Sequence, residues 1–150
     1  MGAGGVARGQ GKIPQFKDYS VANFYKGKNA APVITKDDRT FRTRLREGAK
    51  EEPNFAGRYI LTTWGCGAMC LMGAVIDAKT GKIYWLPHTT CCWKFGDDDF
   101  APVEFLSNSR LIIFSGLRNE SEKDNEDDSH FYEFRDGRFT FTKTVKRKTN

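Results

Sequence analysis

From residue 53 onward, the chain is divided into short runs of β-branched and aromatic residues separated by turn-forming residues. Runs of this length, bounded by Gly, Asp, Asn or Ser, are typical of antiparallel strands joined by tight turns. The clearest turn is Asp136-Gly137, a dipeptide that favours a two-residue hairpin. A second hairpin is predicted across residues 77–81, where Gly81 can adopt the positive φ that such a turn requires. This pattern restricts the chain to a β-rich fold built from hairpins.

One short helix precedes the strands. Phe41 and Leu45 lie four residues apart on one helical face, Asp37 or Asp38 can cap the first turn, and Gly48 is placed to end the helix. We predict a helix over residues 39–47 and an α+β, β-rich fold: an antiparallel sheet of about six strands in a hairpin meander. The predicted strand segments are residues 58–64, 71–76, 82–86, 103–106, 110–115, 131–134 and 139–144.

The size of the chain fits one domain. Its 150 residues are 39% hydrophobic, enough for a single core, and no apolar run approaches the roughly 18 residues that a membrane-spanning helix needs. We therefore predict no integral membrane segment. Residues 1–15 are rich in Gly and poor in apolar side chains, so we expect a flexible N-terminal segment followed by a single β-rich domain over residues 16–150.

Four cysteines fall into two pairs, Cys66 with Cys70 and the adjacent Cys91 and Cys92. In an antiparallel hairpin with one register, the residue numbers of two facing residues have a constant sum. For the hairpin at residues 77–81 this sum is about 159, so Cys70 faces about position 89 and Cys66 faces about position 93. The two pairs should therefore meet. All four cysteines are predicted to form disulfides, and bridges that cross between the pairs are favoured because joining adjacent cysteines closes a strained ring. A local bridge between the first two cysteines is the alternative.

Zinc binding and nucleophilic catalysis compete with disulfides for these cysteines. Cys66, Cys70 and one of the adjacent cysteines could join His88 in a tetrahedral zinc site, but one cysteine would be left over. A thiolate activated by His88 would need a further group to orient the imidazole, which spacing cannot reveal. We assign no catalytic residue, no metal ligand and no cofactor.

Aromatic residues flank the cysteines. Trp64, Trp85 and Trp93 are expected to cover the core, but tryptophan is also common in binding hot spots. Together with His88 they are the predicted binding-surface candidates. His130 opens a predicted strand and is interpreted as a packing or surface residue.

Charge is distributed unevenly along the chain. Residues 1–50 carry eleven Lys or Arg against four Asp or Glu, a net charge of +7, whereas residues 51–150 have a net charge of −2. No nucleic-acid-binding motif accompanies the basic half, so we predict no nucleic-acid partner. Residues 118–129 hold six acidic side chains without an apolar anchor or the spacing of a calcium loop, which predicts a mobile, solvated loop.

Three strings follow one another in the chain: PNFAG-x-Y at residues 53–59, WGCG-x-x-C at residues 64–70 and D-x-x-TG-x-x-Y at residues 77–84. With residues 41–49 and the closing hairpin at residues 131–139, they resemble an uncharacterised family of small exported bacterial proteins over about residues 40 to 145. The resemblance implies a periplasmic or secreted protein whose leader has been removed, since the first residues lack the apolar core of a signal peptide. It supplies no catalytic residue.

The small size, the four cysteines and the lack of a catalytic motif together favour a non-enzymatic binding module that is exported, stabilised by disulfides and directed at a protein partner. An inhibitor of a cell-wall hydrolase or a toxin-neutralising immunity protein would have this size. The alternatives are a hydrolase of the cell envelope that uses a cysteine with His88, and a metal-binding protein. The sequence makes no prediction of the oligomeric state.

Overall fold

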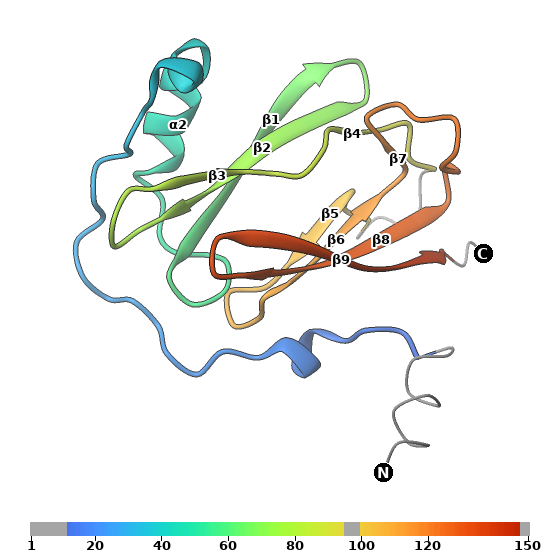
Figure 1. Cartoon of the computed structure of the whole chain (residues 1–150), viewed down its shortest axis with the longest axis horizontal. Coiled ribbons are helices and arrows are strands. Elements are labelled where there is room, and N and C mark those ends of the chain that lie inside the picture. The colour runs from blue at the N-terminus through green and yellow to red at the C-terminus, as the bar shows by residue number, and fades with distance from the viewer. Residues whose placement is uncertain (1–11, 95–99, 148–150) are drawn as a thin grey trace.

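A computed structural model describes residues 12–94 and 100–147 and contains two antiparallel β-sheets and one short α-helix (Figure 1). The predicted α+β, β-rich class is confirmed. The strand number differs, because the described residues form nine strands in two sheets rather than about six in one. The elements are η1 Phe16–Tyr19, η2 Lys36–Phe41, α2 Arg42–Gly48, β1 Tyr59–Gly67, β2 Cys70–Asp77, β3 Ile83–Trp85, β4 Thr90–Cys91, β5 Val103–Phe105, β6 Leu111–Ser115, β7 Leu117–Arg118, β8 Asp128–Arg135 and β9 Arg138–Lys146.

The first sheet has the order β1-β2-β4-β7, and β3 pairs with a different part of β2 than β4 does. The second sheet has the order β5-β6-β8-β9. All pairs between these strands are antiparallel. The two short strands β4 and β7 extend the first sheet beyond what the sequence pattern predicts, because strands of two residues are too short to show alternation.

Alternation along the strands places the main core between the two sheets. Leu61 of β1 and Val75 of β2 point inward and are buried together with Phe114 of β6 and Phe134 of β8. Their sequence neighbours point to the opposite faces, as a period of two requires. The predicted hairpins therefore supply two apolar faces, and these are buried against each other.

The outer faces of both sheets are also covered. Ile60 of β1 and Ile76 of β2 face outward from the first sheet and pack against Leu45 of α2, which is fully buried. On the second sheet, Leu111 of β6 packs with Phe16 of η1 and with other side chains of the same cluster. The helix predicted over residues 39–47 is present in a shifted form, since residues 39–41 belong to the 3₁₀ helix η2 and the α-helix α2 ends at Gly48.

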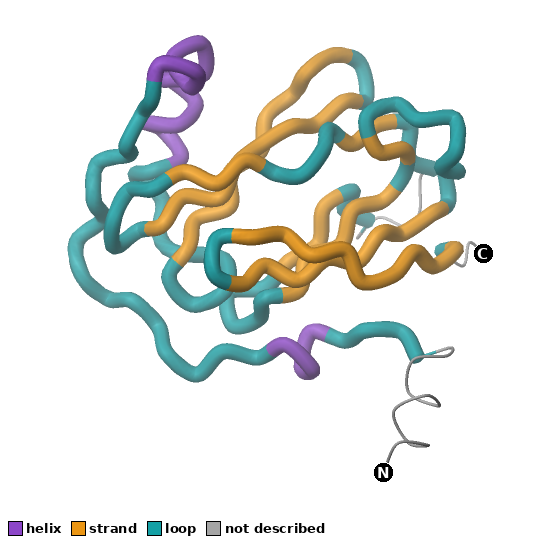
Figure 2. The backbone as a smooth tube through the Cα atoms, viewed as in Figure 1, coloured by secondary structure: helices purple, strands orange, loops and turns teal. Residues whose placement is uncertain are grey.

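Residues 20–33 form a strap that connects the two sheets along one side of the molecule (Figure 2). Near η1, the strap bonds to a turn of the second sheet through the Val21 amide and the Asn108 carbonyl, 2.9 Å apart. Further on, the Val33 amide bonds to the Gly81 carbonyl, 2.8 Å away in the first sheet. A side chain at Gly81, where φ is 81°, would overlap the Ala31 carbonyl, so glycine is needed for this close approach.

The domain prediction is only partly covered by the described residues. Most of the predicted flexible segment, residues 1–15, lies outside them. Residues 12–15 lead directly into η1, where the Gln15 amide bonds to Asp18.

Candidate functional site

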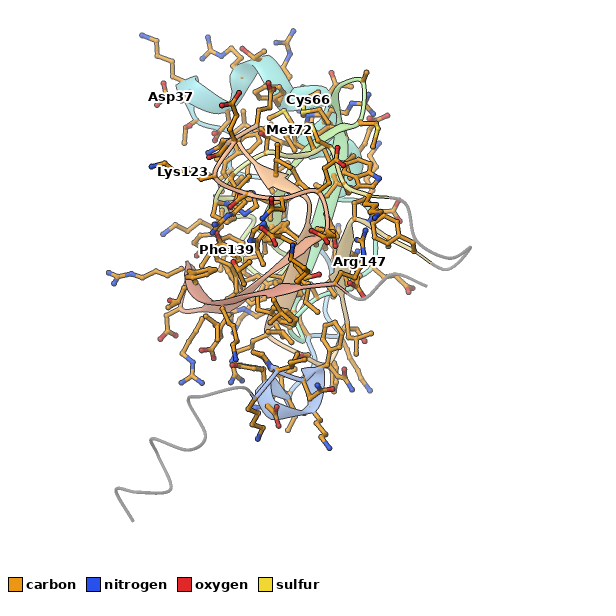
Figure 3. All side chains as sticks on the ribbon, turned by 90° about the vertical axis from the view of Figure 1, so that its right-hand side faces the viewer. Asp37, Cys66, Met72, Lys123, Phe139 and Arg147 are labelled. Atoms are coloured by element: carbon orange, nitrogen blue, oxygen red, sulfur yellow. A yellow bond between two sulfur atoms is a disulfide. The ribbon has the colours of Figure 1, made fainter. Side chains whose placement is uncertain are left out.

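The tip of the hairpin between β1 and β2, which carries Cys66, is exposed to solvent. All five residues from Gly65 to Met69 are exposed, and Met69 keeps 39% of its surface. The turn is tight because the strand register shifts between Gly65 and Gly67 and because Met69 adopts a φ of 49°. Cys66 is bonded to Cys70 across this tip, with Cα atoms 5.0 Å apart, and lies near the upper end of the molecule (Figure 3). The tip is thus a short loop closed by its own disulfide.

The second bridge joins the adjacent residues Cys91 and Cys92, whose Cα atoms are 3.7 Å apart. Cys91 is buried in β4, whereas Cys92 is half-buried and has a φ of 58°. The preference for crossed bridges is therefore wrong in this structure. The bulge at the hairpin tip brings the first pair together locally, and the left-handed conformation of Cys92 turns its side chain back to its neighbour.

The prediction that the two cysteine pairs meet is confirmed, with a two-residue offset. Between β2 and β3, facing positions add up to 159 as predicted, for example Val75 with Tyr84. Between β2 and β4 they add up to 161, so Cys70 faces Cys91. The residues between β3 and β4 contain Pro87, which has no amide hydrogen for a ladder. Two residues are consequently left out of the pairing, and both bridges lie at one end of the first sheet.

The tryptophans do not form one exposed surface. Trp64 is only 7% exposed and packs against Phe41 and Trp85, with ring centroids 5.7 and 5.8 Å away. Trp85 donates its indole N–H to the carboxylate of Asp38 over 2.8 Å, and Trp93 is half-buried. Burial of Trp64 removes it as a contact residue, so the predicted aromatic surface is reduced to the partly exposed Trp85 and Trp93.

His88 is also buried, with 8% of its surface exposed. Its Nδ1 lies 2.8 Å from the carbonyl oxygen of Thr89, so Nδ1 carries the proton and Nε2 is an unprotonated acceptor. The ring packs edge-on against Phe114 at 4.6 Å. Burial lowers the pKa of His88 to about 4, and the backbone hydrogen bond only partly opposes this change. His88 is therefore neutral at pH 7 and lies in the core instead of on the predicted contact surface.

A partly buried charged cluster that the sequence did not predict lies beside β7 and β8. Arg118 donates two hydrogen bonds to the two carboxylate oxygens of Asp124, at 2.9 and 3.0 Å, and a longer one to the Tyr132 hydroxyl. Bonding to Arg118 lowers the pKa of Asp124 to about 2. His130, fully buried, lies 3.6 Å from the same carboxylate. The predicted acidic loop is anchored at one point by a polar contact, because Asp124 bonds to the guanidinium of Arg118 in β7, and its mobility stays a prediction.

The cluster includes three residues with metal-binding side chains, Asp124, Asp128 and His130, whose candidate ligand atoms lie within 4.8 Å of one another. Most of these atoms already have protein partners. Arg118 occupies both oxygens of Asp124, and the nitrogens of His130 bond to the Gly116 carbonyl at 2.7 Å and the Thr144 hydroxyl at 2.8 Å. The arrangement is that of a structural ion-pair network.

The cysteines offer neither a thiolate nucleophile nor zinc ligands in this state. All four are in disulfides, and it is the thiolate that attacks substrates or binds zinc. The candidate site is therefore defined by the two bridges and the exposed hairpin tip.

Comparison with known proteins adds nothing to this picture: no protein-family model, no curated protein and no solved structure matches the chain. In the part of the chain that the structure describes, no helix is both long and apolar enough to cross a bilayer. The function must be inferred from the chemistry of the site.

Proposed function

We propose that this protein is an exported binding module that inhibits a protein partner, a hydrolase of the cell envelope, by inserting the hairpin tip into a cleft of that partner. The observation that carries the proposal is the tip itself: five consecutive exposed residues, Gly65 to Met69, closed by the Cys66–Cys70 bridge. An immunity role would use the same geometry, since inhibitors and immunity proteins both act by occupying a partner's surface.

A closed tip suits tight binding because little conformational freedom is lost when it docks. The bridge and the ladder between β1 and β2 hold the loop in one shape before the partner arrives, which lowers the entropic cost of association. Inhibitors that dock in this way change their backbone little on binding. Methionine is enriched in the centres of protein interfaces, and Met69 supplies the only large apolar side chain of residues 65–69.

Disulfides support the exported location. They form and persist mainly in oxidising compartments such as the periplasm, and this chain commits all its cysteines to them. The alternative of a cysteine hydrolase has less support, because its nucleophile is bonded and His88 is buried in the core. A metal-binding protein also has less support, because the ligand atoms near His130 are already bonded to protein groups.

The test measures inhibition of purified muramidases, amidases and peptidoglycan endopeptidases by the oxidised protein, with purified peptidoglycan as the substrate. Met69→Arg places a charge at the tip and should weaken inhibition by at least about tenfold, the effect of roughly 1.4 kcal/mol at an interface. Phe24→Arg is the matched control, since Phe24 is similarly exposed at 48% but lies in the strap.

The control should inhibit like the parent protein. Equal loss of inhibition in both variants would show that an added positive charge weakens inhibition wherever it is placed, which would contradict the proposal. So would failure to inhibit any enzyme of the panel, or hydrolysis of peptidoglycan by this protein alone.

A further inference from the structure

The two disulfides meet across the ladder between β2 and β4. Cys70 faces Cys91, and the amide of Cys92 donates to the carbonyl of Met69 over 3.3 Å. A hydrogen bond between these flanking residues makes the facing cysteines a non-hydrogen-bonded pair, in which Cα atoms lie about 4.5 Å apart and side chains are closest. Disulfides span Cα separations of about 4.4 to 6.8 Å. Cys70 and Cys91 therefore face each other at bridging distance while each is bonded to another cysteine.

The two bridges differ in their access to solvent. Cys66 is exposed at the hairpin tip, whereas Cys91 is only 2% exposed. Glycines flank Cys66 and present no side chains beside it, and a Cβ added to Gly65 or Gly67 would meet no atom closer than 3.9 or 4.0 Å, so the backbone on both sides of Cys66 is uncrowded. A thiolate from outside the protein thus reaches the Cys66 sulfur far more easily than it reaches the Cys91 sulfur.

We infer that the four cysteines form a thiol–disulfide exchange site that accepts two electrons from a dithiol. One thiolate of the dithiol attacks Sγ of Cys66, which forms a mixed disulfide and releases the thiolate of Cys70. This thiolate attacks Sγ of Cys91, which forms a Cys70–Cys91 bridge and releases the thiolate of Cys92. The second thiol of the dithiol then attacks its own sulfur in the mixed disulfide and releases Cys66.

The overall reaction is balanced. The dithiol loses two electrons and two protons and becomes a cyclic disulfide, and the protein exchanges two bridges for one bridge and two thiols, Cys66 and Cys92. The oxidised protein keeps its two local bridges, so the cross-strand bridge belongs to the two-electron-reduced state alone. This activity goes beyond inhibition of a partner and does not depend on it.

Backbone conformation favours the internal step. Cys92, a residue with a side chain, is held at a φ of 58°, and opening its bridge to Cys91 removes the covalent restraint on that left-handed conformation. Cys70 and Cys91 keep their places in the ladder during the exchange, since only the sulfur atoms change partners. The exchange therefore requires little movement of the sheet.

The first test needs no reductant. Cys66→Ala leaves Cys70 without its partner, so Cys70 should displace Cys92 and link to Cys91. Acid quenching, alkylation and non-reducing peptide mapping should find Cys92 as the alkylated residue. In the matched control Cys70→Ala, the leftover Cys66 faces neither adjacent cysteine and should itself be alkylated. A free Cys70 in Cys66→Ala, with Cys91 and Cys92 still linked, would overturn the inference.

The second test uses the unaltered protein and remains decisive if the variants do not fold. One equivalent of dithiothreitol is added without oxygen, and the product is quenched and mapped in the same way. The major two-electron product should have alkylated Cys66 and Cys92 and a peptide link between Cys70 and Cys91. A major product with alkylated Cys66 and Cys70 and an intact bridge between the adjacent cysteines would show independent bridges and refute the exchange.

Discussion

Acidification from pH 7 to pH 4 should destabilise the protein through His88, because the buried imidazole resists protonation and the unfolded chain does not. The pKa of His88 is lowered from 6.5 to about 4 by burial against Phe114 and its neighbours. Each unit of difference between the pKa of the unfolded chain and that of the folded protein corresponds to about 1.36 kcal/mol of stability. The difference between 6.5 and about 4 therefore amounts to about 3 kcal/mol.

The sign follows from which state binds the proton. Above pH 6.5 both states are neutral at this position, and its contribution to stability is fully present. As the pH falls toward about 4, the imidazole is protonated in the unfolded chain but stays largely neutral in the folded protein, so the free energy of unfolding declines. Asp124, whose pKa is lowered from 3.8 to about 2, begins to lose its own contribution as the pH approaches 4, but this loss is shared by a variant that changes only His88.

The assay is urea unfolding of the parent and of His88→Gln at about pH 7, 5.5 and 4. Glutamine does not titrate and can still donate to the Thr89 carbonyl, so the variant isolates the ionisation of His88 from its hydrogen bond. His130, whose pKa burial also lowers, is present in both proteins, so its own titration contributes to both unfolding curves. The parent should lose about 3 kcal/mol more than the variant between pH 7 and pH 4. Parallel losses in the two proteins would refute the reasoning.

Two further substitutions, and a third that serves as a control, test the described contacts by urea unfolding at neutral pH. Asp124→Asn removes the carboxylate that pairs with the partly exposed Arg118 and should cost about 2 kcal/mol; a cost below about 0.5 kcal/mol would contradict a well-ordered, doubly bonded pair. Gly81→Ala, at a φ of 81° and against the Ala31 carbonyl, should cost about 2 kcal/mol or more. Gly65→Ala, with open space around it, should change stability by less than about 0.5 kcal/mol, and equal costs would contradict the strap geometry.

The hairpin at residues 77–81 shows which part of the strand pairing could be predicted from the sequence. Its turn residues and flanking alternation predicted the register between β2 and β3 correctly, because both signals are local. The same register could not be carried on to Cys91, since the interruption at Pro87 depends on how the chain returns to the sheet. Convergence of the cysteines was therefore predictable, but their bonding partners were not.

The partly buried cluster around Asp124 could not be predicted from the sequence, for a different reason. Six acidic residues between positions 118 and 129 look alike in sequence, and only the fold selects the one that meets Arg118. Burial of His88 is likewise a property of the packed sheets, because Phe114, which covers its ring, comes from a distant segment. Long-range contacts of this kind leave no periodic signal in the chain.

The strap of residues 20–33 also determines the order in which the molecule can be completed. Val21 and Asn108, which the strap joins through a backbone hydrogen bond, are 87 residues apart in the chain. A contact over this distance closes a long loop, and the entropy of that closure is lost before the contact can compensate for it. The strap can therefore dock on the second sheet only after the turn that contains Asn108 has formed, and this step should be slower than the formation of the local hairpins.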